Sequence, residues 1–392
     1  SSAQPLETGA RAPGSFEEGG GAVPWTIGDS EALYKVEGWG RPYFSAGVDG
    51  DMMVRPCGED EGPEISLMRL VEDMKRRNIS MPMLLRFPDI LRHRLQCLQG
   101  CFDSAITAFS YDGCYQGVFP IKCNHDRFII EDILEYGRAT SFGLEAGSKP
   151  ELLIAISQLH RAANDGAAND ALLICNGYKD EGYVETVLLS KRLGVNGVIV
   201  LEQLSDLYTV LSVSRRLRIN PVIGVRAKLS TKHGGHWGST SGDNAKFGLN
   251  VGEVLQVVRV LEAEGMLGCL QLLHFHVGSQ VPSIAIIKEA MREASHMYCE
   301  LAKLGAPMGT IDVGGGLGIS YDGAKGNTSA STNYDMQNYA NDVVAALKDA
   351  CVQKGVPCPT IVSESGRALA SHHAVLVFDV LSAEGGVDPC AG

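Results

Sequence analysis

The sequence contains no apolar run of the roughly 18 residues that a membrane-spanning helix needs. It contains no C-x-x-C pair, and its 11 cysteines share no spacing with histidines that is typical of a zinc site. Basic residues are too few to balance the acids, and the formal net charge of −12 disfavours nucleic acid or an anionic membrane as a partner. These absences predict a soluble chain with a small-molecule or protein partner, and no nucleic acid or membrane.

The start of the chain lacks the periodic apolar pattern of a folded segment. Residues 1–24 are rich in Gly, Ala, Ser and Pro, so we predict a disordered or linker segment. Glu7, Glu17 and Glu18 disfavour an intact transit peptide, because such peptides are poor in acidic residues. The odd number of cysteines in so long a chain favours a reducing compartment, where cysteines serve as small buried apolar residues.

From residue 25 onward the composition is that of an ordinary globular protein. The stretch "PYFSAGVDGDMMVRP" predicts two short strands around the turn at Asp49 and Gly50, which begin a small β unit. Apolar residues at helical spacing predict helices over 67–78 and 88–109, and these lead into the main domain.

The rest of the chain repeats one unit, a short apolar strand followed by a turn and an amphipathic helix such as 150–163 or 251–265. Eight such units close most naturally into an α/β fold of the TIM (β/α)8 barrel type, and an open doubly wound sheet is the alternative that periodicity leaves open. The predicted strands cover 117–122, 140–145, 171–177, 197–202, 221–227, 270–278, 310–316 and 360–365.

Polar residues follow these strands at their carboxyl ends. In "QGVFPIKCN" an apolar run ends on Lys122, whose ammonium group either enters solvent or points into a site. In a barrel all such ends meet at one mouth, so residues far apart in sequence would meet there. The polar residues and turns at the predicted strand ends are Lys122, Glu145, Asn176, Glu202, Arg226, His276, Gly314 to Gly316, Glu364 and Arg367.

The stretch "IDVGGGLG" places three glycines directly after a strand. A loop without Cβ atoms can bring its N–H groups close to a phosphate, although a tight structural turn is the alternative. With a lysine and a carboxylate at the same mouth, this loop points to pyridoxal 5'-phosphate (PLP). In this interpretation Lys122 binds the aldehyde, Gly314 to Gly316 and Arg367 bind the phosphate, Glu364 keeps the ring nitrogen protonated, and His276 stacks on the ring.

From residue 25 to its end the chain resembles the fold type III, alanine racemase-like PLP-dependent amino acid decarboxylases, most closely the biosynthetic arginine decarboxylases of plants and bacteria. The resemblance rests on "WGRPYF", "YQGVFPIKCN", "FGLEAGSKPEL", "ICNGYKD", "KFGL", "LHFHVGSQ", "IDVGGGLGISYDG" and "SESGRA". The run "YQGVFPIKCN" and the segment "STKHGGHWGSTSGDNA" before "KFGL" favour the arginine branch over the ornithine, lysine and diaminopimelate branches.

The resemblance also implies roles for single residues. Lys122, which would form a Schiff base with PLP, and His276, which would cover the ring, are the expected catalytic residues. The expected cofactor-binding residues are Lys122, Glu145, Arg226, His276, Ser279, Gly314, Gly315, Gly316, Glu364 and Arg367, and Lys246 matches a position at the same mouth. The expected substrate-binding residues are Asp312, Gly318, Tyr321 and Asp322. No metal ligand is assigned, although resemblance to the family makes Mg²⁺ a candidate second cofactor.

For the whole protein the resemblance implies decarboxylation of L-arginine to agmatine and CO2, the first step of a polyamine route to putrescine and spermidine. It implies a homodimer or larger assembly with shared active sites, in the plastid (chloroplast) or the cytoplasm. Family members continue into a β domain with a catalytic cysteine, so the resemblance is to their N-terminal portion. We therefore expect this chain to be a fragment, a processed piece or one part of an assembly. The expected domains are 25–65, N-terminal strands of the β domain; 66–370, the PLP-binding barrel; and 371–392, the start of the C-terminal β domain.

Two other functions fit the same residues. A diaminopimelate or other basic amino acid decarboxylase would share almost every cofactor residue. A non-catalytic relative could keep the barrel as a regulatory module. The intact Lys122, Gly314 to Gly316, Glu364 and Arg367 favour cofactor binding instead. An alanine racemase is disfavoured, because a racemase of this fold places an arginine, and not a carboxylate, at the ring nitrogen.

Overall fold

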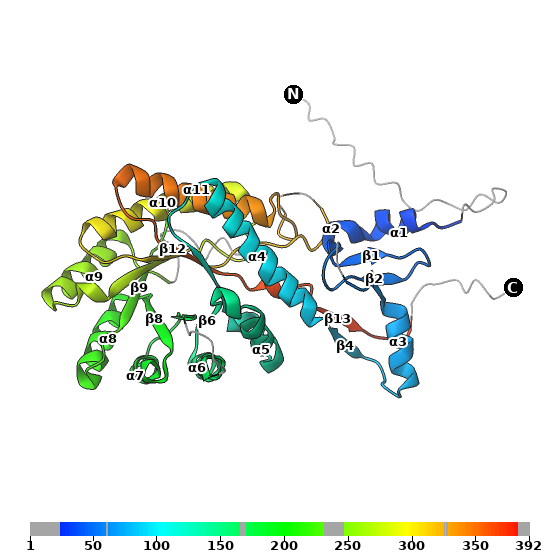
Figure 1. Ribbon diagram of the computed structural model, residues 1–392, viewed down its shortest axis with the longest axis horizontal. Coiled ribbons are helices and arrows are strands. Elements are labelled where there is room, and N and C mark those ends of the chain that lie inside the picture. The colour runs from blue at the N-terminus through cyan, green and yellow to red at the C-terminus, as the bar shows by residue number, and fades with distance from the viewer. Residues whose placement is uncertain are drawn as a thin grey trace, which may run out of the picture.

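The computed structural model describes residues 24–59, 62–164, 170–230, 247–324, 326 and 328–382. Its largest part is a closed barrel of eight parallel strands (Figure 1). The strands are β5 (Tyr115–Pro120), β6 (Gly143–Ala146), β7 (Leu172–Cys175), β8 (Asn196–Leu201), β9 (Val222–Arg226), β10 (Leu270–His274), β11 (Thr310–Asp312) and β12 (Thr360–Glu364). β9 pairs with β10 and β12 pairs with β5, which closes the ring. The predicted TIM barrel is confirmed, and the open-sheet alternative is wrong.

Helices surround the barrel on its outside, as the helix predictions required. They are α4 (Pro88–Ala108), α5 (Arg127–Tyr136), α6 (Lys149–Asn164), α7 (Glu181–Ser190), α8 (Leu204–Leu217), α9 (Val251–Ala263), α10 (Ile284–Lys303), α11 (Met336–Lys354) and α12 (Arg367–Ala370). The helix after the last strand, α12, is a single short turn. α4, which precedes the first strand, packs against both α11 and α5 and so completes the ring of helices.

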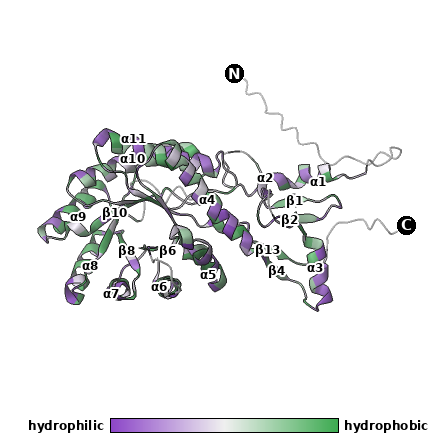
Figure 2. Cartoon of the chain, in the orientation of Figure 1, coloured by the Kyte–Doolittle hydropathy of each residue, from purple (hydrophilic) through white to green (hydrophobic). Residues whose placement is uncertain are grey.

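Branched apolar side chains explain why these segments form buried parallel strands. One cluster of buried residues fills the inside of the barrel, so the barrel is a packed core and not a pore. It consists of Val118, Ile174, Val198, Val200, Leu272 and Val362. A larger cluster lies between strands and helices. Figure 2 shows helices with one hydrophobic and one hydrophilic side, as this packing requires.

Seven of the eight strands end earlier than predicted, and the reason is local for β5 and β11. β5 ends at Pro120, which has no N–H to continue the ladder, and Lys122 lies in the 3-10 turn η1 (Ile121–Cys123). β11 ends at Asp312, because Gly314 has a φ of 65° and turns the chain away. β10 ends at His274, so His276 lies in the loop after the strand.

A smaller unit precedes the barrel in sequence and lies at one end of it in Figure 1. Its elements are α1 (Ile27–Tyr34), α2 (Val36–Gly40), β1 (Phe44–Ala46), β2 (Met52–Val54), β3 (Ile65–Ser66) and α3 (Leu67–Arg76). β1 and β2 form the predicted antiparallel pair around Asp49 and Gly50. Tyr43, Phe44 and Val54 form its core together with Phe87 and Ile90, which ties the unit to α4.

A second small sheet joins distant parts of the sequence. β4 (Met83–Arg86) pairs antiparallel with β13 (Ala374–Val377) outside the barrel, although β4 falls within the range 66–370 predicted for the barrel domain. The division into domains at residues 65 and 370 stays a prediction. Residues 1–23 and 383–392, which hold most of the predicted linker and the end of the predicted β domain, lie outside the described residues.

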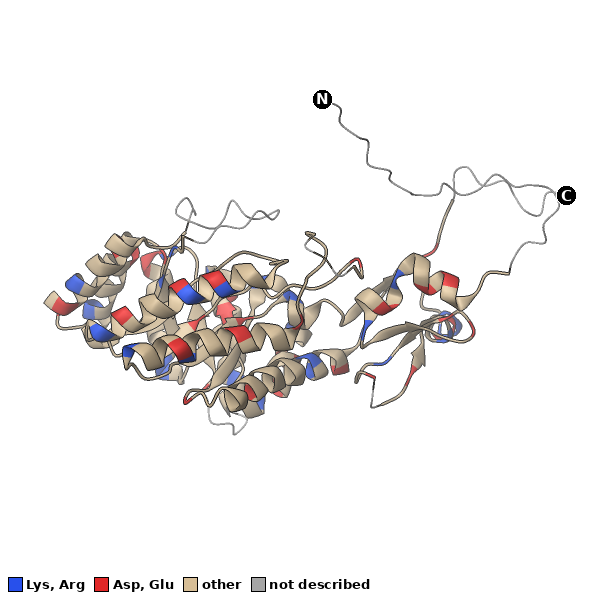
Figure 3. Ribbon diagram, turned by 90° about the horizontal axis from the view of Figure 1, so that it is seen from above, with Lys and Arg blue, Asp and Glu red and all other residues tan. Residues whose placement is uncertain are grey.

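The outer helices carry many charged residues. Figure 3 shows acidic and basic residues interspersed along the helices seen in that view, as on ordinary solvated surfaces. Within the described part of the chain, no helix has both the length and the apolar character needed to cross a bilayer.

Candidate active site

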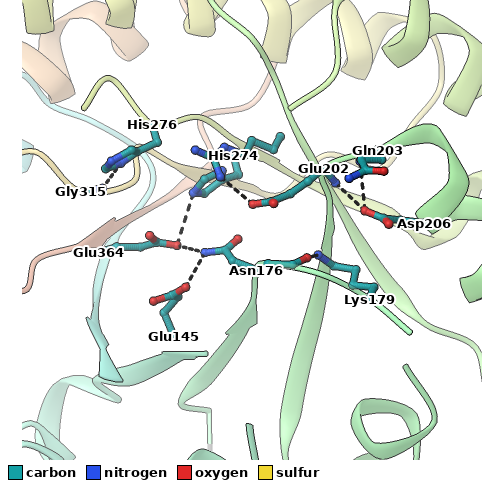
Figure 4. A network of polar contacts seen from close by, with 12 residues as sticks. Glu145, Asn176, Lys179, Glu202, Gln203, Asp206, His274, His276, Gly315 and Glu364 are labelled. Atoms are coloured by element: carbon teal, nitrogen blue, oxygen red, sulfur yellow. Dashed lines mark hydrogen bonds and ion pairs between the residues drawn. The ribbon is translucent and has the colours of Figure 1, made fainter. Parts of the chain in front are cut away.

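The carboxyl ends of the barrel strands bring the predicted residues to one mouth. Figure 4 shows several of them pointing toward one another from different strands. Glu145 and Glu364 lie within β6 and β12, Arg226 ends β9, and Asn176 and Glu202 directly follow β7 and β8. The expectation that these strand ends converge is therefore confirmed.

Lys122 and Glu145 form an ion pair at the end of β5. The Nζ atom of Lys122 lies 3.1 Å from Oε2 of Glu145, whose side chain is fully buried. The lysine side chain is 59% exposed, so its amine is accessible from the mouth. Burial acts to lower the pKa of Lys122, but the carboxylates of Glu145 and Glu364 outweigh it and raise that pKa. The amine is thus protonated at neutral pH and must lose a proton before it can act as a nucleophile.

Glu145 has the properties of the group that takes this proton. Its burial, together with the nearby charge of Glu364, raises the pKa of Glu145 to about 7. A carboxyl with a pKa near the working pH exchanges protons readily with a neighbouring base. Glu145 can therefore accept a proton from Lys122 and donate it back.

The raised pKa of Glu145 predicts a pH dependence of folding. The unfolded carboxyl has a pKa near 4.5 and the folded one near 7, so this group costs stability increasingly as the pH rises from about 5 to 8. Without added PLP, the free energy of unfolding of the wild-type protein should fall over this range by up to about 3 kcal/mol relative to Glu145→Gln. Urea unfolding at pH 5, 6.5 and 8 measures it. Parallel curves for the two proteins would contradict the assignment.

Asn176 connects the two buried carboxylates (Figure 4). Its Nδ2 donates one hydrogen bond to Oε1 of Glu145 at 3.1 Å and another to Oε1 of Glu364 at 2.7 Å. His274 lies on the other side of Glu364, with Nε2 3.4 Å from Oε1. Burial acts to raise the pKa of Glu364, but His274 and the charge of Lys122 outweigh it and hold that pKa below its usual range. Glu364 is therefore an anionic acceptor inside the mouth.

A second ion pair lies beside this network. Nη1 of Arg226 donates to Oε1 of Glu202 at 2.6 Å, and the guanidinium also lies 5.8 Å from the ring centroid of Phe247. Asp206 accepts the backbone N–H of Glu202 at 3.0 Å and fixes the turn after β8. Burial acts to raise the pKa of Glu202, but Arg226 outweighs it and lowers that pKa. Arg226 is thus held in one orientation at the mouth.

Gly314 to Gly316, which we call the glycine turn, and His276 form another part of the mouth. The N–H of Gly315 donates to Nδ1 of His276 at 3.2 Å, and Asp312 accepts the N–H of Gly314 at 2.8 Å. A Cβ on Gly314 would lie 2.3 Å from the carbonyl oxygen of Phe275, and one on Gly316 would lie 2.8 Å from that of Gly278. The turn therefore requires glycine at both positions.

His276 is neutral under ordinary conditions. Burial and the positive charge of Arg226 lower the pKa of His276 to about 3. Because Nδ1 accepts the hydrogen bond from Gly315, the ring proton is placed on Nε2. An uncharged imidazole suits the predicted role of covering an aromatic ring, and that role stays a prediction.

The crowding at Gly314 predicts a large effect of one methyl group. Gly314→Ala places a Cβ against a backbone carbonyl at a φ of 65°, so we expect destabilisation of about 2 kcal/mol or more and weaker phosphate binding. Thermal unfolding and PLP titration measure the two effects. Gly100→Ala is the control, because a Cβ at this position in α4 meets nothing within 4 Å. Equal stability of the two variants would contradict the assignment.

Arg367 lies at the start of α12 beside the glycine turn. Its Nη2 donates to Oγ of Ser279 at 2.6 Å, and its Nη1 lies 3.4 Å from the hydroxyl oxygen of Tyr321. Gln280 links the two loops, because its Oε1 accepts the N–H of Ile319 at 3.0 Å. A guanidinium, a hydroxyl and glycine N–H groups are the donors that a phosphate group binds in proteins.

Three of the four predicted substrate-binding residues, Gly318, Tyr321 and Asp322, follow the glycine turn, and Asp312 ends β11 before it. Asp312 is fully buried below the glycine turn, and the N–H of Gly318 donates to the hydroxyl of Tyr334 at 3.2 Å. Tyr321 is half exposed beside Arg367, while Asp322 accepts the N–H of Ala324 at 2.9 Å. Their role in substrate binding stays a prediction. Lys246 and most of the segment before it lie outside the described residues.

Sequence reasoning missed three buried residues at the mouth. His274 lies two residues before His276 in "LHFHVG", and this spacing places both on one side of an extended strand, a signal that was available. Lys179 is buried and donates to the carbonyl of Gly177 at 2.6 Å, and its burial lowers its pKa. Lys179 and Gln280 each lie two residues beyond a predicted strand, 171–177 and 270–278, as Arg367 lies beyond 360–365, so a signal was available for them too.

The residues at the mouth fit PLP. Arg367 and Ser279 place a guanidinium and a hydroxyl group side by side, which suits a phosphate group. An accessible amine on Lys122 suits the aldehyde, and the anionic Glu364 suits a protonated ring nitrogen. The donors and the acceptor thus occupy separate parts of one mouth.

A closed (β/α)8 barrel that combines these groups is of the class that holds a phosphorylated carbonyl cofactor. Residues 102–371 match the family described as pyridoxal-dependent decarboxylase, pyridoxal binding domain. The chain belongs to this family, and the predicted resemblance is confirmed.

Curated relatives carry one name repeatedly. A "Biosynthetic arginine decarboxylase" of Thermosynechococcus vestitus is 56% identical over 357 residues, which cover 91% of this chain and 55% of the relative. "Arginine decarboxylase 1" of Oryza sativa subsp. japonica is 51% identical over 399 residues, which cover 99% of this chain and 56% of the relative. The chain thus spans about half the length of the curated relatives it matches.

Solved structures agree on the fold. The biosynthetic arginine decarboxylase of Campylobacter jejuni is 30% identical with a TM-score of 0.77, and the match covers 88% of this chain and 53% of that chain. A diaminopimelate decarboxylase of Helicobacter pylori, in complex with L-lysine, is 21% identical with a TM-score of 0.61 and matches 78% of this chain and 68% of that chain. The second likeness extends to the fold alone.

Proposed function

We propose that this barrel binds PLP at its mouth through the predicted residues. Lys122 supplies the amine that holds the aldehyde carbon, and Glu145 takes and returns the proton of that amine. Arg367, Ser279 and the glycine turn at Gly314 to Gly316 bind the phosphate, and the N–H groups of Gly314 and Gly315 would leave their present acceptors, Asp312 and His276, to do so. Glu364 accepts the N–H of the ring nitrogen, and the neutral ring of His276 covers one face of the cofactor. The bound cofactor would supply an electron sink for the carbanion left when CO2 departs.

We further propose that the protein of which this barrel is the cofactor-binding part decarboxylates L-arginine to agmatine and CO2, at the start of a polyamine route. One observation carries the proposal. A continuous series of polar contacts runs from the accessible Lys122 through Glu145 and Asn176 to Glu364, so the aldehyde-binding and ring-binding groups belong to one network. Figure 4 shows its buried part, from Glu145 to Glu364. The choice of arginine is supported by the curated relatives named above.

Other basic amino acids are the main alternative, because the cofactor residues do not distinguish them. Diaminopimelate is the second candidate substrate, because a decarboxylase for it would share almost every cofactor residue. A non-catalytic role is disfavoured by the intact lysine, glycine turn and anionic Glu364.

The proposal extends to assembly, compartment and metal. We propose a homodimer or larger assembly with shared active sites, located in the plastid or the cytoplasm, since relatives occur in rice and in cyanobacteria. In the described part of the chain, His274, Asp312 and Glu364 are the residues whose possible metal-ligand atoms lie within 4.8 Å of one another. Because Glu364 is assigned to the ring nitrogen, Mg²⁺ bound here would compete with PLP.

The test is release of CO2 and amine from L-arginine, L-ornithine, L-lysine and diaminopimelate in parallel, with PLP present. It is run with the chain alone and with the chain mixed with the part of the Thermosynechococcus relative that the match leaves uncovered. Agmatine formed from arginine, with the other three substrates slower by on the order of 10²-fold or more, supports the proposal. Faster turnover of diaminopimelate, or no turnover in either preparation although PLP is bound, would overturn the choice of arginine.

A further inference from the structure

We propose that Asn176 is a positioning residue for the proposed PLP site, where its side-chain amide fixes Glu364 for the ring nitrogen and separates it from Glu145. The inference rests on the proposed function and assigns a role to a residue that resemblance to the family did not mark. Asn176 follows β7, and its NH2 group donates one hydrogen bond to Glu145 in β6 and another to Glu364 in β12, across the mouth (Figure 4).

The amide can be oriented in only one way. Glu364 is anionic and can only accept, so the NH2 group of Asn176 must face it, and the same group then also reaches Oε1 of Glu145. The side chain is nearly fully buried, with 5% of the residue exposed. Both donors of the NH2 group are used, because they lie 3.1 Å and 2.7 Å from the two oxygens.

The backbone holds Asn176 in place. Its N–H donates to the carbonyl of Ala146 at 3.0 Å, and its own carbonyl accepts the hydroxyl of Tyr183 at 3.2 Å. Gly177 has a φ of 75°, and a Cβ there would lie 1.9 Å from the carbonyl oxygen of Gly147. The amide is thus fixed to β6 by its backbone and reaches Glu364 on the far side of the mouth with its side chain.

Electrostatics gives the amide its role. Two carboxylates that share a buried site repel each other, so one of them tends to take up a proton. A neutral NH2 group donates to both without adding charge, and its shorter bond to Glu364 favours the anion there. Glu145, with a longer bond to Asn176, is left to exchange its proton with Lys122.

The test compares PLP with its 1-deaza analogue, in which carbon replaces the ring nitrogen. If Asn176 acts through Glu364, the wild-type protein binds PLP more tightly than the analogue by on the order of tenfold or more, and Asn176→Ala loses most of this preference. The ¹⁵N chemical shift of ring-labelled PLP should move toward the unprotonated value in the same variant. Asn220→Ala is the control, because Asn220 is exposed at the amino end of β9.

The outcomes separate the inference from the proposed function. Equal losses of affinity for PLP and the analogue, with an unchanged ¹⁵N shift, would reduce Asn176 to a structural residue and overturn the inference alone. Failure of the wild-type protein to bind PLP would overturn the proposed function and this inference with it. If Asn176→Ala does not fold, the near-isosteric Asn176→Asp replaces it and should also lose the preference, because the new carboxyl group competes with Glu364 for protons.

Discussion

Under the proposed function, and in the preparation that converts L-arginine, replacing Lys122 by alanine is expected to lower the rate of CO2 release by on the order of 10³-fold or more. The variant loses the amine that holds the cofactor aldehyde, and Glu145 loses the base to which it passes a proton. The measurement is the turnover rate at saturating PLP and arginine. Lys122→Arg keeps a positive charge beside Glu145 but cannot serve as the nucleophile, so it should be equally impaired.

Two controls separate chemistry from structure in this experiment. Lys354→Ala removes a lysine of an exposed ion pair with Glu300, at the end of α11, and should leave the rate unchanged. A small primary amine added to Lys122→Ala should restore part of the lost rate, because it replaces the missing amine. An undiminished rate in Lys122→Ala would contradict the assignment.

Glu364→Gln is expected to lower the turnover rate by on the order of 10²-fold to 10³-fold. The new amide keeps the shape of the side chain but removes the anionic acceptor that the ring nitrogen needs. It also places an NH2 group near the NH2 group of Asn176, which donates to Glu364 at 2.7 Å in the wild-type protein. Steady-state rates in the presence of PLP measure the effect.

The matched control for this substitution is Glu300→Gln, which changes an exposed carboxylate in the same way. We expect less than about a twofold change for Glu300→Gln, because exposed ion pairs contribute little. A similar rate for the wild-type protein and Glu364→Gln, with PLP bound in both, would show that Glu364 does not serve the ring nitrogen.

The barrel could be predicted because its strands are buried on both faces. Runs such as 197–202 contain apolar residues without alternation, and a turn and an amphipathic helix follow most of them. The role of α4 could not be predicted, since periodicity describes a helix but not its neighbours. Its place between α11 and α5 depends on closure of the ring between β12 and β5.

The site was predictable where single residues follow strands, and not where distant residues meet. Lys122, Glu145 and Glu364 could be identified because the end of a barrel strand is where active sites form. The bridging role of Asn176 depends on the turn at Gly177 and on the width of the mouth, which no local pattern encodes. The burial of Asp312 depends in the same way on how the glycine turn folds over it.

The most direct test of the central claim, that PLP binds at Lys122, is borohydride reduction of the protein in the presence of PLP, followed by peptide mapping. We expect one modified peptide that contains Lys122 within "VFPIKCN", and no modification of Lys122→Ala. The buried Lys179 serves as an internal control and should stay unmodified. Modification of another lysine, or of none, would contradict the assignment of this mouth as the cofactor site.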